Sequence, residues 1–478
     1  MEYPSSRASW LVTLAAIAVA VVFVAMRWYA AIDPDAGLTL TAAWQVSQGL
    51  LPYRDFFEFH PPGAFYILAA VFRVVGPSFA AAKFFSLAVM VLTALPFLAL
   101  ARRLKLAPAQ RVAALAVWAL LALQFPLISY STYAHLASIW VIWLLISAWQ
   151  AAHAATPSAA RQAVGYFFGL GMAVTAVGWL LQTRGAALAL VGLGAAVATR
   201  RPRLLVAYAG GLALAALPVL ALPLREFWQQ TVVYPAQYYP AANTDNALWL
   251  AAWLGVTAAG GLAAFAARQR AAAFWLLWLS AVAGMVSIWP HADLLYLSLV
   301  LWPLPLLYFA VPLRRVWRWT SGVLLALPVA VLGVLSLSLF ITLLPMELRA
   351  NPFGVGAPYW QELAAAVQAR TAPGEPIFAT PTLPNLYFFA QRPNATRFNS
   401  LFSQQYGPKH FQEAIADLRR VRPKLVVREL DSMAVKIGIH RDGTAVDQYL
   451  DQYYEVIAEL RGFAPHRFQL LAPKSAEE

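Results

Sequence analysis

The sequence predicts a polytopic α-helical membrane protein that carries a small α/β domain at its C-terminal end. Two features of the composition favour this fold class: 61% of the 478 residues are hydrophobic, and only 12% are charged. Soluble domains carry about 25% charged residues, so this chain has too few polar groups to cover a globule in water. The lipid bilayer must therefore be the solvent for most of the chain.

Apolar stretches recur along residues 1–346, the predicted transmembrane module. Because a spanning helix needs about 20 apolar residues, they predict about eleven spans. The stretches lie at 10–28, 80–101, 111–128, 132–151, 162–181, 185–199, 204–223, 247–267, 271–289, 292–312 and 319–345. The stretch at 185–199 is the shortest of them.

Basic residues gather in every second connection between these stretches. They lie at 7, 102–111, 161, 200–203, 268–270 and 314–318. The positive-inside rule places these connections, and with them the N-terminus, in the cytoplasm. The other connections are then expected outside the cytoplasm, at 29–79, 128–131, 224–246 and 289–292, together with everything after about residue 346.

The net charge of +13 does not indicate nucleic-acid binding, because the basic residues form short clusters beside apolar stretches, where they anchor to anionic lipid. The chain has no cysteine, which excludes disulfides, thiolate metal sites and a cysteine nucleophile. The first apolar stretch, Trp10–Met26, lacks a cleavage site and is expected to be retained. Heavy use of Ala, Leu, Arg and Pro is typical of a GC-rich bacterial genome, so we expect a bacterial cytoplasmic membrane protein.

The character of the sequence changes at about residue 347. Residues 347–478 hold 14 of the 22 acidic residues, and short β-like runs alternate there with helical patterns. The β-like runs are Pro376–Ala379, Lys424–Arg428 and Phe468–Leu471, and the helical patterns are Tyr359–Arg370, Lys409–Val421 and Ala445–Leu460. This alternation predicts a small soluble α/β domain outside the cytoplasm.

The long outside connection at 29–79 contains two predicted helices. In Ala36–Gly49, Leu40 and Trp44 share one helix face while Thr41 and Gln45 share another, so we expect a helix that lies in the membrane interface. The apolar stretch Gly63–Val75 is too short to span and is also expected to lie along the surface.

Half of the acidic residues before 347 fall in this same connection. Asp33, Asp35, Asp55 and Glu58 lie there, and His60 follows at once. Charge near a bilayer is costly and needs a reason, although a water-exposed loop carries carboxylates freely. The acids by themselves leave both interpretations open.

The sequence around these acids resembles a known family. IDPDAG (32–37) is followed by GLLPYRDFFEFHPPGAFYIL (49–68), and this pattern resembles the GT-C glycosyltransferases of the protein mannosyltransferase and aminoarabinose transferase type. The tail segment TLPNLYFFAQRPNATRFNS (382–400) resembles their outside domain. The resemblance implies an inverting enzyme that takes a sugar from a polyprenyl-phosphate carrier and passes it to a glycan, lipid or protein acceptor.

The resemblance assigns the catalytic carboxylate to Asp35, with Asp33 as a nearby alternative. Many relatives have a second acid next to this position, whereas this chain has Ala36. A positioned carboxylate can accept the proton that the acceptor hydroxyl loses as it attacks the sugar C1. Asp55, Glu58, His60 and His135 are further candidates on the catalytic or acceptor side.

The leaving group of such a reaction is a lipid phosphate, so the site needs cations. The candidates are Arg54, Lys83, Arg184 and His291. Arg184, in GWLLQTRG (178–185), lies where many relatives carry Lys or Arg, but a snorkelling interfacial arginine is an equal alternative. For Lys83, anchoring at the membrane surface is the stronger interpretation.

A divalent metal is a weaker expectation. Glu58, His60 and His135 form the one-carboxylate, two-histidine set that suits zinc, but they come from different connections and make no motif. His135 opens SYSTYAHLASIW (129–140), where relatives often have an Asp, and a packed histidine is the alternative. No cofactor is otherwise implied.

Two other classes of function remain open. A secondary transporter or lipid flippase often has internal repeats and ionisable groups near the midplane, whereas no repeat is visible in this sequence and its apolar stretches carry almost no acid. A non-catalytic subunit of a cell-envelope glycan assembly would keep the fold with a dead site, and Ala36 leaves that open.

Overall fold

The computed structural model describes most of the chain and divides it into two compact units. The described residues are 14, 18, 21–28, 34–122, 127–242, 247–266, 268–269, 271–288, 300–310, 334, 338, 341–342, 356–403, 406–431, 440, 443–461 and 467–475. Unit 1 consists of Met1–Ala30, Phe84–Val219 and Asp245–Glu347. Unit 2 consists of Ala31–Lys83, Leu220–Thr244 and Leu348–Glu478.

Unit 2 joins three segments that the sequence places on one side of the membrane. Residues 31–83 and 220–244 belong to the predicted transmembrane module, but in the structure they pack with the C-terminal part. The division of the chain into 1–346 and 347–478 stays a prediction.

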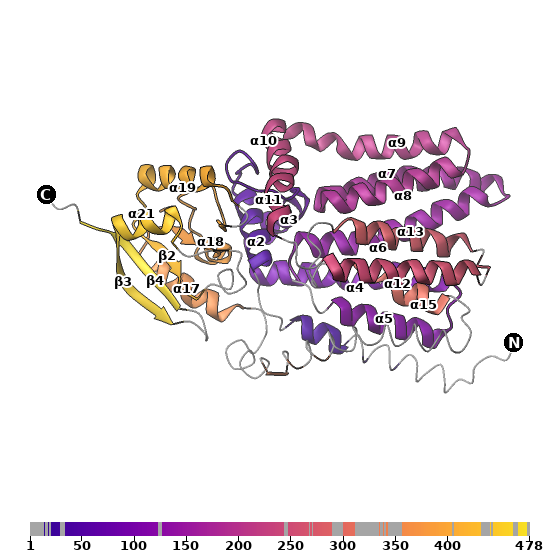
Figure 1. Cartoon of the computed structure of the whole chain (residues 1–478), viewed down its shortest axis with the longest axis horizontal. Coiled ribbons are helices and arrows are strands. Elements are labelled where there is room, and N and C mark those ends of the chain that lie inside the picture. Colours follow the sequence, from indigo (N-terminus) through magenta and orange to yellow (C-terminus); the bar gives the residue numbers. More distant parts are fainter. Residues whose placement is uncertain are drawn as a thin grey trace. The chain divides into compact units, whose positions relative to one another are not determined.

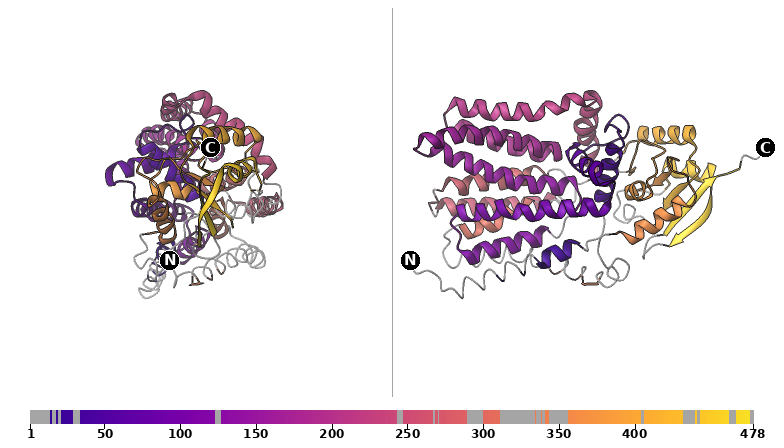
Figure 2. Two further views of the ribbon diagram at one scale, coloured as in Figure 1. Left: turned by 90° about the vertical axis from the view of Figure 1, so that its left-hand side faces the viewer. Right: turned by 180° about the vertical axis from the view of Figure 1, so that it is seen from behind.

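The described residues of unit 1 form helices joined by short connections. Its helices are α4 (Phe79–Arg103, from Phe84 on), α5 (Pro108–Ala122), α6 (Tyr130–His153), α7 (Pro157–Leu180), α8 (Gln182–Ala198), α9 (Pro202–Ala216), α12 (Ala247–Ala266), α13 (Ala272–Val286) and α15 (Pro303–Ala310). Helix α7 packs against α6, α8 and α9, and α13 packs against α6, α8, α12 and α15. Figures 1 and 2 show these long helices side by side.

Four of the described helices are long and apolar enough to cross a membrane. They are Phe79–Arg103, Tyr130–His153, Pro157–Leu180 and Pro202–Ala221, the last being α9 continued by a 3-10 turn. Helices α5, α8 and α13 coincide with further predicted spans but are shorter. The stretches at 10–28 and 292–312 are described only in part, and 319–345 at only a few residues, so the total of about eleven spans stays a prediction.

Glycine permits a close approach between α7 and α9. A Cβ on Gly171 would lie 2.8 Å from the backbone nitrogen of Leu212, and a Cβ on Gly211 would lie 3.0 Å from that of Met172. Helices in lipid attract one another mainly by van der Waals packing, so small residues that bring backbones together are the favoured contact.

The C-terminal part of unit 2 is a four-stranded sheet with helices. The strands β1 (Phe378–Thr380), β2 (Val426–Glu429), β3 (Tyr454–Arg461) and β4 (Arg467–Pro473) lie in the order β1-β2-β4-β3. The β1–β2 pair is parallel, with Phe378 opposite Val426, and the other two pairs are antiparallel. The helices of this part are α17 (Pro358–Gln368), α18 (Pro384–Ala390), α19 (Pro408–Val421) and α21 (Ala445–Tyr453).

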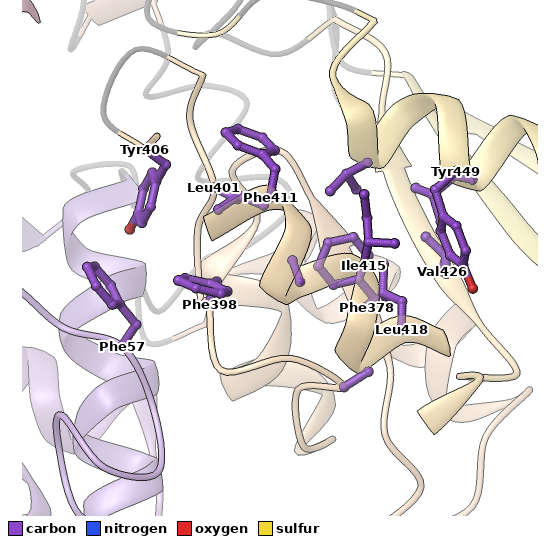
Figure 3. Packing of buried hydrophobic residues seen from close by; sticks show 14 of the residues in the cluster. Phe57, Phe378, Phe398, Leu401, Tyr406, Phe411, Ile415, Leu418, Val426 and Tyr449 are labelled. Carbon is purple, nitrogen blue, oxygen red and sulfur yellow. The ribbon is translucent and has the colours of Figure 1, made fainter. Parts of the chain in front are cut away.

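The core of this α/β part lies under α19 and α21. Leu418 from α19, Leu450 from α21 and Val426 from β2 are all buried in one hydrophobic cluster, part of which is drawn in Figure 3. Helix α19 shows the strong apolar stripe that its sequence predicts, with Phe411, Ile415 and Leu418 on the buried face.

The predicted helix Ala445–Leu460 is wrong in its second half. Helix α21 ends at Tyr453, and the chain continues as strand β3, which pairs with β4. The stretch from 454 carries Tyr454, Val456 and Ile457, whose side chains suit a strand, and the backbone pairing with β4 decides between the two structures. In a short apolar run, the periodicity of the sequence does not distinguish a helix from a strand.

The segment 31–83 contributes two helices to unit 2, as predicted. Helix α2 is Pro34–Ser47 and α3 is Gly63–Val75. Helix α2 is not an exposed helix, because Leu40 and Trp44 on one face and Thr41 and Gln45 on the other are all buried in protein. Its position in the membrane interface stays a prediction. The polar side chains of Thr41 and Gln45 form hydrogen bonds with other protein groups, described below, instead of with water.

A buried aromatic cluster, consisting of Phe57, Tyr234, Phe398, Tyr406 and His410, joins the three segments of unit 2. The ring centroids of Phe57 lie 4.9 Å from Tyr234, 5.4 Å from Phe398 and 5.4 Å from Tyr406. Tyr234 begins α11 (Tyr234–Ala242), which follows α10 (Leu224–Trp228) and a π-helical turn, Gln229–Val233. Figure 3 shows Phe57 facing Phe398 and Tyr406.

His410 in this cluster is predicted to make stability depend on pH. Burial, with the nearby charges of Lys409 and Arg397, lowers the pKa of His410 to about 4. The Gly407 N–H donates to its Nδ1 (3.1 Å), which requires the unprotonated nitrogen. In the unfolded chain a histidine titrates near 6.5, so between those two values the unfolded state binds the additional proton and stability falls as the pH falls.

Melting of the purified protein in detergent between pH 7.5 and 4 measures this loss. The His410→Gln variant, which keeps a hydrogen-bond acceptor but does not titrate, should lose less of its melting temperature over the same range. Parallel curves for the two proteins would contradict the role of His410.

Candidate functional site

Asp35 lies in the first turn of α2 and is half-buried. Pro34 is the first helical residue, where its missing N–H costs nothing, and an acidic residue in the first turn is favoured by the helix dipole. Ala36, which takes the place of the second acid of many relatives, is buried. The structure therefore presents one described carboxylate at this helix start; Asp33 lies outside the described residues.

Asp55 and Arg54 are paired with each other at the surface of unit 2. Arg54 Nε and Nη2 donate to the two carboxylate oxygens of Asp55, each at 2.8 Å, and the N–H of Leu51 also donates to Asp55 at 2.8 Å. The hydrogen bonds from Arg54 lower the pKa of Asp55. Asp55 thus closes the turn at 51–55, and Arg54, whose side chain is 59% exposed, is occupied by it.

Glu58 and His60 form a buried pair next to this turn. Oε1 of Glu58 accepts hydrogen bonds from the backbone N–H groups of Phe59 and His60, both at 2.9 Å, and lies 2.6 Å from Nδ1 of His60. Only 3% of the Glu58 side chain is exposed. A buried carboxylate is tolerated when such donors satisfy it, so the pair fixes the backbone at 58–60.

Gln230, in the π-helical turn, ties this loop to the second segment of unit 2. Its Oε1 accepts from the Glu58 N–H (3.0 Å), and its Nε2 donates to the carbonyl of Tyr53 (2.8 Å). π-Helical turns are rare and often occur at functional sites. The sequence gives no signal for Gln230, because a single glutamine 172 residues away from Glu58 forms no pattern with the loop.

Tyr53 completes the loop. Its hydroxyl donates to the carbonyl of His60 at 2.8 Å, and burial together with the charge of Glu58 raises the pKa of Tyr53, so the hydroxyl stays a donor. The backbone φ of Tyr53 is +72°, in the left-handed region that costs a non-glycine residue about 1–2 kcal/mol. The contacts with His60 and Gln230 hold this conformation.

Arg184 is buried in unit 1, in the first turn of α8. Only 3% of the residue is exposed, so it does not snorkel to an interface. Its Nε donates to the hydroxyl of Ser287 at 2.9 Å, and Ser287 donates in turn to the carbonyl of Gly284 at 2.6 Å. Arg184 forms no ion pair with a carboxylate among the residues the structure describes. A buried guanidinium of this kind favours an anion as its partner.

The remaining candidates have protein surroundings. Lys83 is buried, with its Nζ 5.3 Å from the ring centroid of Phe79. His135, on α6 in unit 1, accepts from the indole N–H of Trp118 at 3.2 Å and contacts the ring of Trp302. These aromatic neighbours favour the interpretation of His135 as a packed histidine. His291 lies outside the described residues.

The structure brings Glu58 and His60 together in unit 2, whereas His135 belongs to unit 1. Within the described ranges, no group of three or more His, Asp or Glu side chains is arranged to hold a metal ion. The metal site predicted from Glu58, His60 and His135 stays a prediction.

Solved structures match this chain over nearly its whole length, whereas comparisons with protein-family models and with curated proteins give no match. The chain is similar to ArnT, an aminoarabinose transferase from Cupriavidus metallidurans, in a crystal structure bound to undecaprenyl phosphate. The TM-score is 0.55, the identity is 14%, and 98% of each chain is covered. For the apo structure of the same protein, the TM-score is 0.52, the identity is 15%, and 98% of each chain is covered.

A second relative is the oligosaccharyltransferase of Archaeoglobus fulgidus in its apo form. Its TM-score is 0.53 and its identity 11%, and the match covers 92% of this chain and 73% of that chain. Both relatives belong to the GT-C superfamily. The chain has the GT-C fold. The predicted resemblance is thereby confirmed at the level of the fold.

The GT-C fold also confirms the broad class expected from composition, a multi-pass membrane protein. Because the identity to these structures is at most 15%, the activity of this chain must be argued from its own residues.

Glu58 is predicted to hold the loop at 53–60 in place. Glu58→Ala leaves two backbone N–H groups and the His60 ring without their acceptor, and should destabilise unit 2 by about 2–5 kcal/mol. Glu58→Gln, which keeps an acceptor oxygen, should cost less.

The control is Glu413→Ala, which removes a half-exposed ion pair with Arg397 and should cost below about 1 kcal/mol. Urea unfolding in detergent measures all three, and equal stability of the two alanine variants would refute the role of Glu58.

Proposed function

We propose that this protein transfers a sugar from a polyprenyl-phosphate donor to an acceptor hydroxyl outside the bacterial cytoplasmic membrane, with inversion at the anomeric carbon. The observation that carries the proposal is the position of Asp35. It is the one described carboxylate in the first turn of α2, in a chain with the GT-C fold. Undecaprenyl phosphate in the ArnT structure supports a lipid phosphate as the leaving group.

The reaction would need one base and no strong acid. The acceptor oxygen attacks the sugar C1 as the bond between C1 and the phosphate oxygen breaks, and the polyprenyl phosphate leaves with the bonding electrons. The hydroxyl proton passes to Asp35. Because a phosphate is already a good leaving group, cationic side chains that hold its charge contribute more than protonation would.

Arg184 is the best supported phosphate ligand. It is buried, it is held at Nε by Ser287, and it has no ion-pair partner among the described residues. Arg54 is exposed and bonded to Asp55, and Lys83 packs on Phe79, so both are weaker candidates. A guanidinium binds two phosphate oxygens through parallel N–H groups, which an ammonium cannot do.

The grouping of 31–83, 220–244 and 348–478 in unit 2 supports a common side for these segments. With the basic connections in the cytoplasm, that side is outside. Asp35, on α2 of this unit, would then meet an acceptor that is a glycan, a lipid or a protein outside the membrane.

Asp35→Asn is predicted to abolish sugar transfer without unfolding the protein. Removing a general base costs typically about 10²–10⁴-fold in rate. The measurement is release of polyprenyl phosphate from a panel of polyprenyl-phosphate sugars by protein in nanodiscs. Asp417→Asn, in a surface pair with Arg420, is the matched control.

Full turnover by Asp35→Asn with loss of turnover in Asp33→Asn would move the base to Asp33. Absence of release from any donor, together with substrate-dependent transport in proteoliposomes, would favour a transporter or flippase. Absence of both, with a partner retained on gentle purification, would favour a non-catalytic subunit.

Arg184→Gln is predicted to raise the donor KM by about 10–100-fold, because a hydrogen bond to a charged group contributes about 1.5–3 kcal/mol. Arg184→Lys should recover part of the loss, since it keeps the charge but not the planar fork. Ser287→Ala, which removes only the support at Nε, is the milder comparison. An unchanged donor KM in folded Arg184→Gln would exclude Arg184 from the phosphate site.

A further inference from the structure

Helix α2 is held by one short piece of the C-terminal part, residues 384–399. The hydroxyl of Thr41 donates to the carbonyl of Pro384 at 2.6 Å, across 343 residues of sequence. Gln45 and Asn399 exchange two amide hydrogen bonds: Gln45 Nε2 donates to Asn399 Oδ1 at 3.1 Å, and Asn399 Nδ2 donates to Gln45 Oε1 at 2.9 Å. All of these side chains are buried.

The start of α2 is held by the same piece. A Cβ on Gly37 would lie 2.8 Å from the backbone nitrogen of Asn385 and would collide with its side chain, so only glycine allows α18 this close. Gly37 is two residues from Asp35. The contacts at Gly37 and Gln45 are eight residues apart, or about 12 Å along the helix. Two anchors at this distance fix the tilt of α2 as well as its position.

The anchor residue Asn399 is itself held in a closed turn. Asn394 Nδ2 donates to the carbonyl of Phe398 at 2.7 Å, and Asn394 Oδ1 accepts from the N–H of Thr396 at 2.9 Å. The turn is joined to the strand region by Ala395 N–H, which donates to the carbonyl of Ile377 at 2.8 Å. A buried amide at the end of such a turn has little freedom to follow a moving partner.

The same piece also holds the loop at 53–60. The N–H of Phe57 donates to the carbonyl of Arg397 at 2.8 Å, two residues before Asn399. Residues 384–399 therefore contact both helix α2 and the loop at 53–60, although both precede them by more than 300 residues. An independent domain that only touched α2 at its surface would not need buried hydrogen bonds in both directions, as Gln45 and Asn399 form here.

We propose that residues 384–399 position the catalytic carboxylate, and that the Gln45–Asn399 amide pair is the contact that fixes α2 for the reaction. This inference rests on the proposed function of Asp35. Gln45 and Asn399 are positioning residues, since they act on the substrate only through the placement of Asp35. A displacement of about 1 Å in a catalytic group can cost about 10²-fold in rate.

Exchange of the two amides tests the proposal. Asn399→Ala and Gln45→Ala should each lower kcat for donor turnover by about 10–100-fold and leave the donor KM unchanged, because the phosphate ligands are untouched. The double exchange Gln45→Asn with Asn399→Gln keeps the same amide groups and the same total length, and should restore most of kcat. Gln412→Ala, an exposed amide on α19, is the matched control and should change nothing.

A second measurement needs no turnover. The chain contains no cysteine, so Asp35→Cys creates a single thiol whose rate of maleimide labelling reports the accessibility of that position. Labelling should be faster when Asn399→Ala is added, and should return toward the starting rate in the double exchange.

The two readouts separate the inference from the proposed function. If the wild-type protein moves no sugar but labelling responds as expected, the anchoring of α2 stands and the enzymatic role fails. If the protein turns over donor while Asn399→Ala changes neither kcat nor labelling, the positioning role is overturned and the function stands. A loss of kcat that the double exchange does not restore would also overturn it.

Discussion

The buried aromatic cluster around Phe57 is the contact on which the rest of unit 2 depends. Phe57, Tyr234 and Phe398 come from three segments that are separated by transmembrane sequence, and no backbone continuity holds them together. Large rings bury much apolar area at little conformational cost, and this contact brings the loop at 53–60 against the turn that carries Asn399. The hydrogen bonds of Gln230 and of Phe57 then fix the loop within that apolar frame.

The acids of the first segment have different surroundings, and these separate their roles. Asp55 is occupied by Arg54 and a turn N–H, and Glu58 by two backbone donors and His60. Both carboxylates stabilise backbone that has no regular structure. Asp35 instead begins a helix that is fixed at two points along its length. A catalytic base must be held in place, and the contacts at Gly37 and Gln45 meet that requirement for the helix that carries Asp35.

The sequence predicted the helices of unit 1 well, because an apolar run of spanning length has few alternatives in lipid. It also predicted α19, β1, β2 and β4 to within a few residues. It was wrong about the second half of 445–460, where pairing with β4 decides for a strand, and it did not show that protein buries both faces of α2. An amphipathic pattern shows which residues share a face, but it does not show whether lipid, water or protein covers that face. Gln230 was missed for the related reason that its partners are distant in sequence.

The sequence by itself determined the solvent of this protein, the positions of its apolar helices and the family it resembles. These follow from composition, from the length of apolar runs and from a local motif, all of which are set by neighbours along the chain. Only the tertiary structure decided that 31–83 and 220–244 pack with the C-terminal part, that Arg184 is buried beside Ser287, and that Gln45 pairs with Asn399. The last two contacts join residues 103 and 354 positions apart, and such pairs are chosen by shape and hydrogen-bond complementarity in the folded chain.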